Sequence, residues 1–266
     1  MKEDQSIYQN LKLWLSKQIN VEQPQTKQLH FEDQQIHLDP IFDSHNQKFI
    51  GVICNQLHQT NEKNYLLDFK NALDDISYWY CHGRAILSLL PLPVTFLNQT
   101  EFLAMYENSI IASQLPVGQI RVPLIAYKNQ DIKSFEAPLK KLQRLGLIFE
   151  LKNFSGNQTE LSWLNSQMFQ GIHISTGFLR AAMTTTLSRE LFNDLLITCQ
   201  SQNHHTYGEG ISLVHDFNFA KDNHIQYCYG PLMMPSVSKH QLLKITSSQL
   251  STSLNSTPIK HNQYGD

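Results

Sequence analysis

The feature that most constrains the fold of this chain is a regular alternation of short β-rich runs and helical patterns that begins at Leu29. Such alternation is typical of parallel β/α units, in which a helix follows each strand and packs on the sheet. About eight units fit within some 220 residues, so an α/β fold with one closed (β/α)8 barrel of the TIM type is favoured over two domains. The β-rich runs are 36–42, 49–54, 85–90, 120–126, 146–151 and 171–175, and the helical patterns are 65–81, 101–114, 132–145, 176–182, 188–201 and 215–222. Ser188 is the predicted N-cap of the 188–201 helix.

A separate amphipathic pattern precedes the alternation. Apolar residues at helical spacing in residues 6–19 predict a helix added before the barrel. Its apolar face consists of Ile7, Leu11, Trp14, Leu15 and Ile19. An ordinary packing helix is the simplest interpretation, and a helix that binds a partner or forms a homodimer is the alternative. We therefore divide the chain into an N-terminal helix and linker (1–28), a barrel (29–246) and a flexible tail rich in Ser, Thr and Asn (247–266).

The charge and hydropathy of the chain argue against nucleic acids and membranes as binding partners. Lys and Arg total 21 against 23 Asp and Glu, which gives a net charge of -2 at pH 7. This balance argues against direct binding of nucleic acid, which would need a basic stripe along the phosphates. The longest apolar runs fall far short of the roughly 18 residues of a membrane span. Charged residues also interrupt the first 20 positions, so no secretion signal is predicted. We expect a cytoplasmic protein that does not contact a membrane.

Common catalytic and metal motifs are absent from the sequence. The four cysteines are widely scattered without a CxxC pair, so neither a disulfide framework nor a zinc ribbon is indicated. No Walker loop, GxGxxG, nucleophile elbow or HExxH occurs. Glu209 is the one carboxylate that stands out, because Gly208 and Gly210 let the backbone turn tightly and expose it at a strand end.

Four landmarks nevertheless occur in the order and spacing of a known family. The stretch 147–178 (LIFELKNFSGNQTELSWLNSQMFQGIHISTGF) resembles the strand, Phe-containing loop, helix and strand of EAL domains, the bacterial cyclic-di-GMP phosphodiesterases. GEGIS at 208–212 is similar to the AEGVE motif, and YGPLMMP at 229–235 is similar to the QG-to-P segment. Residues 37–51 resemble the first hairpin, which leads to the EAL triplet. The resemblance covers roughly 29–245 and implies an EAL-type barrel.

The resemblance also implies loss of the catalytic centre. EAL enzymes hold two divalent metals on acidic and amide side chains at the C-terminal ends of the barrel strands, where the metals activate water for attack on a phosphodiester. Here Ile53 takes the place of the glutamate of the EAL triplet, and Lys152 and Asn153 take the places of the paired aspartates of the DDFG loop. The other matched positions follow, with the residue that the family has there in parentheses. They are Leu57 (an arginine that steadies the ligand's phosphate), Leu90 (an asparagine), Ile125 (a glutamate), His173 (a lysine), Ser175 (an aspartate), Glu209 (the same glutamate, the first of the AEGVE motif) and Ser212 (the second glutamate of the AEGVE motif).

Electrostatic repulsion is a second argument that the catalytic metals cannot bind. Replacing an aspartate by Lys152 changes the local charge by two units where two cations would sit. At about 4 Å, even with an effective dielectric constant near 20, each contact between a cation and the lysine is unfavourable by several kcal/mol. We therefore expect no catalytic residue, no metal and no other cofactor. Glu209 is expected to be structural and to pair with Lys152 or His173 across the barrel mouth.

The resemblance thus implies a non-enzymatic bacterial regulator, a pseudoenzyme of cyclic-di-GMP signalling that acts by binding another protein. Stand-alone degenerate EAL proteins include ones that sequester the flagellar master transcription factor, so a transcription or motility regulator is the example partner. Ile7, Leu11, Trp14 and Leu15 are the first candidates for the partner contact. The alternative is a receptor that binds cyclic di-GMP without hydrolysing it. Leu57 argues against the receptor because it removes the phosphate-facing arginine, although Lys152 offers a point charge.

Overall fold

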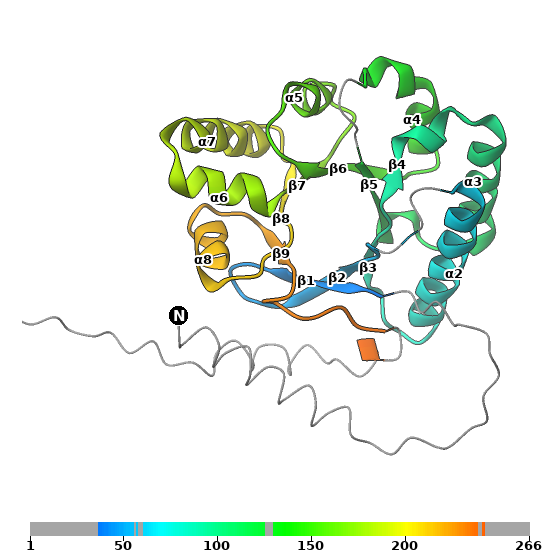
Figure 1. Cartoon of the computed structure of the whole chain (residues 1–266). Coiled ribbons are helices and arrows are strands. Elements are labelled where there is room, and N and C mark those ends of the chain that lie inside the picture. The colour runs from blue at the N-terminus through cyan, green and yellow to red at the C-terminus, as the bar shows by residue number, and fades with distance from the viewer. Residues whose placement is uncertain (1–36, 56, 58–60, 126–129, 239–240, 243–266) are drawn as a thin grey trace, which may run out of the picture.

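The computed structural model describes residues 37–55, 57, 61–125, 130–238 and 241–242. Within this part of the chain, eight strands close into a ring in the order β3-β2-β1-β9-β8-β7-β6-β5, and β5 pairs back with β3 (Figure 1). The strands of the ring are β1 (Asp39–Asp43), β2 (Phe49–Ile53), β3 (Leu87–Leu89), β5 (Ile120–Ile125), β6 (Ile148–Phe154), β7 (Gly171–Ile174), β8 (His205–Gly208) and β9 (Tyr227–Tyr229). The short β4 (Leu92–Pro93) pairs with the end of β5. The predicted α/β fold with a closed barrel is confirmed.

The first strand runs against all of its neighbours. β1 is antiparallel to both β2 and β9, whereas the other pairs in the ring are parallel. The cause is the short turn between β1 and β2, because only antiparallel strands can be joined by a tight hairpin. The Asp43 carboxylate stabilises this turn by accepting the backbone N–H groups of His45 and Asn46, each at 2.9 Å. As a result, Asp39 at the start of β1 lies opposite Ile53 at the end of β2.

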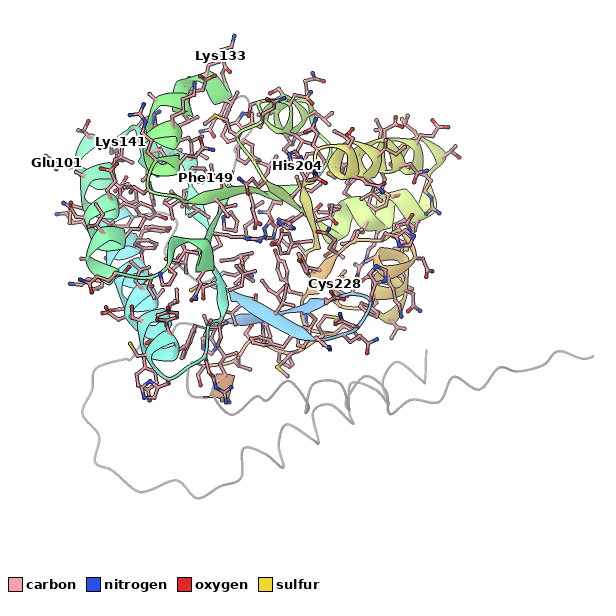
Figure 2. The ribbon with its side chains drawn as sticks, turned by 180° about the vertical axis from the view of Figure 1, so that it is seen from behind. Glu101, Lys133, Lys141, Phe149, His204 and Cys228 are labelled. Atoms are coloured by element: carbon pink, nitrogen blue, oxygen red, sulfur yellow. The ribbon has the colours of Figure 1, made fainter. Side chains whose placement is uncertain are left out.

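Helices cover the outside of the barrel (Figure 1). They are α2 (Glu62–Cys81), α3 (Thr100–Ser113), α4 (Glu136–Gln143), α5 (Gln158–Leu164), α6 (Thr176–Thr184), α7 (Thr186–Ser201) and α8 (Val214–Asp222), with 3-10 turns η1 (Val94–Asn98), η2 (Val117–Gln119) and η3 (Ile132–Phe135). Apolar side chains between the strands and the helices form the main core, and the buried Phe149 of β6 belongs to it (Figure 2). None of the helices in the described ranges is both long and apolar enough to cross a membrane.

Several sequence predictions need correction or stay untested. The predicted cap of α7 was wrong, because the Thr185 side chain accepts the backbone N–H of Ser188 and the helix begins earlier than predicted. The alternation pattern also missed β8 and β9, which span only four and three residues. The predicted helix of residues 6–19, the linker up to 28 and the tail 247–266 lie outside the described residues.

Candidate functional site

The candidate site lies at the barrel mouth, which we define as the end where the parallel strands finish and β1 begins. Side chains alternate along a strand, so every second residue points into the barrel. Ile53, Ile125 and Lys152 occupy such positions at the mouth, where Ile53 pairs with Asp39 and Ile125 with Lys152 in the strand register. Glu209 directly follows β8. The structure thus places Ile125 beside Lys152, and Ile53 and Glu209 lie at the same end of the barrel.

An ion pair dominates the charge at the mouth. The Lys152 ammonium contacts the Glu209 carboxylate, and the two side chains are only 6% and 15% exposed. The backbone N–H of Asn153 donates to the other carboxylate oxygen at 3.3 Å. Asn153 reaches this position because it adopts a left-handed backbone (φ 58°) at an irregularity in the β6–β7 register. Glu209 therefore pairs with Lys152, one of the two partners predicted for it.

A small cavity opens beside this pair. Its volume is about 140 Å³, and Asp39, Asn55, Glu209, Tyr229 and Ser236 are among its lining residues. The Asn55 amide donates to one Asp39 oxygen at 2.5 Å, and the Ser236 hydroxyl contacts the other. Asp39 thus has a partner on each carboxylate oxygen, whereas the Asn55 Oδ1 atom is buried without a hydrogen-bond partner.

Below the mouth, the barrel interior holds a buried polar network. Glu150 of β6 is fully buried and accepts hydrogen bonds from Arg121 at 2.8 Å and from the Tyr207 hydroxyl at 3.0 Å. His173 Nε2 lies 3.0 Å from the second Glu150 oxygen, so Nε2 carries the proton because a carboxylate only accepts. His173 Nδ1 lies 3.0 Å from the Tyr229 hydroxyl. The network connects β5, β6, β7, β8 and β9 across the interior.

Charges and hydrogen bonds set the protonation of this network. Burial alone would raise the pKa of Glu150, but the hydrogen bond and charge of His173, followed by those of Arg121, outweigh burial and lower it. Burial raises the pKa of Tyr207 and of Tyr229 well above the ordinary value, and the Glu150 charge adds to both shifts. Glu150 is therefore an anion at neutral pH, while the two phenols keep their protons.

The other predicted positions lie away from the Lys152–Glu209 pair. Leu57 and Leu90 are buried in the core between strands and helices. His173 lies in the barrel interior and bonds to Glu150 rather than to Glu209. The Ser175 hydroxyl caps α6 by accepting the backbone N–H of Phe178 at 3.3 Å. Ser212 is exposed and accepts from Arg180 at 2.9 Å.

The groups at the mouth do not fit a pair of divalent metals. Such a centre needs several anionic oxygens that converge and remain available. Here Glu209 is neutralised by Lys152, and Ile53 and Ile125 supply no ligand. Asp39 bonds to Asn55 and Ser236. Across the described ranges, no group of three or more His, Cys, Asp and Glu side chains could hold a metal ion.

Sequence reasoning missed the interior network. Its members Arg121, Glu150 and Tyr207, like Asp39 and Asn55 at the mouth, were not among the predicted site residues. A signal was nevertheless present, because Arg121 and Glu150 are charged residues within the otherwise apolar runs 120–126 and 146–151. A charge inside such a strand indicates either an exposed face or a buried partner, and parallel strands of a barrel have no exposed face.

Comparison with solved structures identifies the fold of the barrel. The barrel has the (β/α)8 fold of EAL domains. The EAL domain of Mycobacterium smegmatis DcpA is similar with a TM-score of 0.68 and 14% identity, over 82% of this chain and 96% of that chain. The PaMucR phosphodiesterase in its c-di-GMP complex has a TM-score of 0.67 and 15% identity, over 89% of this chain and 99% of that chain.

A third structure with this fold is the EAL domain of Xanthomonas citri FimX, solved in complex with c-diGMP. It has a TM-score of 0.62 and 9% identity, over 76% of this chain and 87% of that chain. Neither the protein-family models nor the curated protein sequences gave a match to this chain. At these identities, the likeness establishes the fold alone.

Proposed function

We propose that this protein is a non-enzymatic regulator of cyclic-di-GMP signalling, located in the cytoplasm, that acts by binding another protein. The observation that carries the proposal is the Lys152 ammonium held against Glu209 at the barrel mouth. A cation in that place repels divalent metals and neutralises the carboxylate that the family motif retains. The fold supports a link to cyclic di-GMP, because two structures that share it were solved with that ligand.

The first test is hydrolysis. Purified protein with magnesium or manganese is expected to leave cyclic di-GMP intact, because Ile53, Ile125 and Lys152 supply no anionic oxygen for the metals. Product formation is followed by chromatography, with an active phosphodiesterase as the positive control. Metal-dependent turnover that disappears in the Glu209→Ala variant would contradict the proposal.

The second test separates the regulator from a receptor for cyclic di-GMP. We expect weak or no binding by calorimetry, because the buried Lys152 is already paired and the ligand's phosphates would have to be desolvated against mostly neutral groups. The informative variant is Lys152→Met, which keeps an unbranched apolar side chain, one atom shorter, and removes the charge. Lys141→Met, at an exposed lysine of α4, is the matched control. Micromolar binding that only Lys152→Met abolishes would establish the receptor instead.

The third test concerns the protein partner. Ile7, Leu11, Trp14 and Leu15 are the first candidates for the contact, and they lie outside the described residues. Trp14→Ala is expected to lower recovery of a partner in pull-downs from the native bacterium while the barrel stays folded, since tryptophan anchors are frequent hot spots. Lys17→Ala, in the same segment, is the control. If Trp14→Ala and a deletion of residues 1–22 both recover as much partner as the wild type, this role is eliminated. If the variants change only the oligomeric state, the segment is a homodimer contact.

A further inference from the structure

A wide groove runs between α2 and α3 on the outside of the barrel. The two helices lie side by side (Figure 1), and the groove between them has a volume of about 900 Å³. Buried Leu73 and Phe102 and the nearly buried Leu66 form its floor, while Leu67 and Met105 stand on its walls. The Gln99 amide bridges the two helices at one end by donating to Glu62 at 2.5 Å.

The floor of the groove is apolar, and charged side chains such as Lys63, Lys70 and Glu101 also line it. Leu67 and Met105 are 61% and 56% exposed, on facing helices. Apolar side chains gathered in a groove mark an interaction site more often than scattered single residues do. Stacked rings support the floor, since Phe69 of α2 and Tyr106 of α3 lie 4.2 Å apart. A supported floor keeps the groove open without a ligand, so binding requires little ordering of the barrel.

We propose that the amphipathic segment 6–19 of the same chain docks in this groove. The segment carries one apolar face with Trp14 at its centre, the chemistry that a groove between two helices accepts. As a helix, its 14 residues would extend over about 21 Å, and α3, also of 14 residues, has the same length. We choose this segment as the occupant because its length as a helix matches that of α3 and its apolar face matches the apolar floor of the groove.

The connection to the barrel also permits docking within one molecule. Residues 20–38 join the segment to β1 and could span as much as about 60 Å. β1 begins at the mouth, and α2 starts on the same side because it follows the end of β2. A tether of this kind gives an effective concentration of about a millimolar, so docking in cis outcompetes a second copy at micromolar protein.

Docking would regulate the proposed function. The apolar face that we propose for the partner contact would be covered while it lies in the groove, so partner and groove would compete for it. This regulatory part rests on the proposed function, but the docking itself does not. The test of docking therefore uses the full chain without any partner.

Trp14 is its own reporter, because the other two tryptophans, Trp79 and Trp163, are 1% and 0% exposed. Acrylamide quenching is measured on the wild type and on Trp14→Phe, and the difference isolates Trp14. We expect Trp14 to be protected in the wild type. In the double variant Leu67→Glu, Met105→Glu, its quenching is expected to rise to that of free N-acetyltryptophanamide, with a red-shifted emission. The control is Ile197→Glu on α7, which is 65% exposed on the opposite side of the barrel (Figure 1).

The outcomes separate the possible occupants. Protection that survives dilution, is lost in the double variant and persists in Ile197→Glu supports docking in cis. Full accessibility in the wild type, or protection that persists in the double variant, overturns the proposal. Protection lost on dilution assigns the groove to a second copy and also overturns it. The double variant leaves the segment free to bind a partner. If the quenching data support docking but even the double variant captures no partner, the proposed function is wrong and the docking proposal is still supported.

Discussion

Replacing Glu150 with alanine is expected to lower the free energy of unfolding by about 3–5 kcal/mol, the range found when one member of a buried ion pair is removed. The loss is large because the Arg121 guanidinium and the His173 ring would then lie in the barrel interior without their acceptor. For a protein of this size, such a change lowers the melting temperature by about 10 °C or more. Urea unfolding and calorimetry measure both quantities.

The control for this prediction is Glu136→Ala. Glu136 pairs with Lys140 on α4, but both side chains are well exposed, so we expect a loss of only about 0.5 kcal/mol or less. Equal losses for the two variants would show that the interior network contributes no more than a surface pair. The same outcome would remove the argument that Glu150 anchors the barrel.

The contribution of Glu150 should also depend on pH. Its folded-state pKa is depressed, so its stabilising effect is present above the unfolded-state pKa, near 4.5, and is lost as the pH falls through the folded value. The difference in stability between the wild type and Glu150→Gln is therefore expected to be constant near neutral pH and to shrink below about pH 4.5. A difference that grows with acidity would contradict the assigned protonation.

Replacing Gly51 with alanine is expected to prevent normal closure of the barrel between β2 and β3. A Cβ atom at Gly51 would lie 2.3 Å from the backbone oxygen of Leu87, and no rotation of a side chain relieves that contact. The parallel pairing of Gly51 with Leu87 would have to open, at about 3 kcal/mol or more. Soluble yield and the free energy of unfolding measure the effect.

Gly118→Ala is the matched control for this variant. A Cβ atom there would meet no heavy atom within 4 Å, so stability is expected to stay within about 0.5 kcal/mol of the wild type. Wild-type stability of Gly51→Ala would contradict the close approach of β2 and β3 at this position.

The fold was predictable from sequence to the extent that its elements are long and regular. The helices α2, α3 and α7 each span 14 residues or more, which is long enough for an apolar stripe to show. β9 spans three residues, Tyr227–Tyr229, and no periodicity can be detected over that length. Its place in the ring follows only from its pairing with β1 and β8.

The candidate site was predictable only in part, and the reason is geometric. The Lys152–Glu209 pair could be anticipated because the resemblance placed both residues at strand ends. Leu90 could not be located this way, because the direction of a side chain changes with each step along a strand. Likewise, the hydrogen bonds of His173 to Glu150 and Tyr229 join three strands far apart in sequence, and only the closed ring brings them together.

The antiparallel β1 also has a consequence for how the protein is made. β1 pairs with β9, and the Ser44 hydroxyl contacts the Ile225 carbonyl oxygen 181 residues further along the chain. During synthesis from the N-terminus, β1 and β2 can pair as a hairpin early, but the ring stays open until β9 leaves the ribosome. Contacts of such long sequence separation slow folding, and the open edge of β1 is exposed to wrong pairing in the meantime. The nascent chain is therefore most open to mispairing in the interval between the emergence of β1 and that of β9.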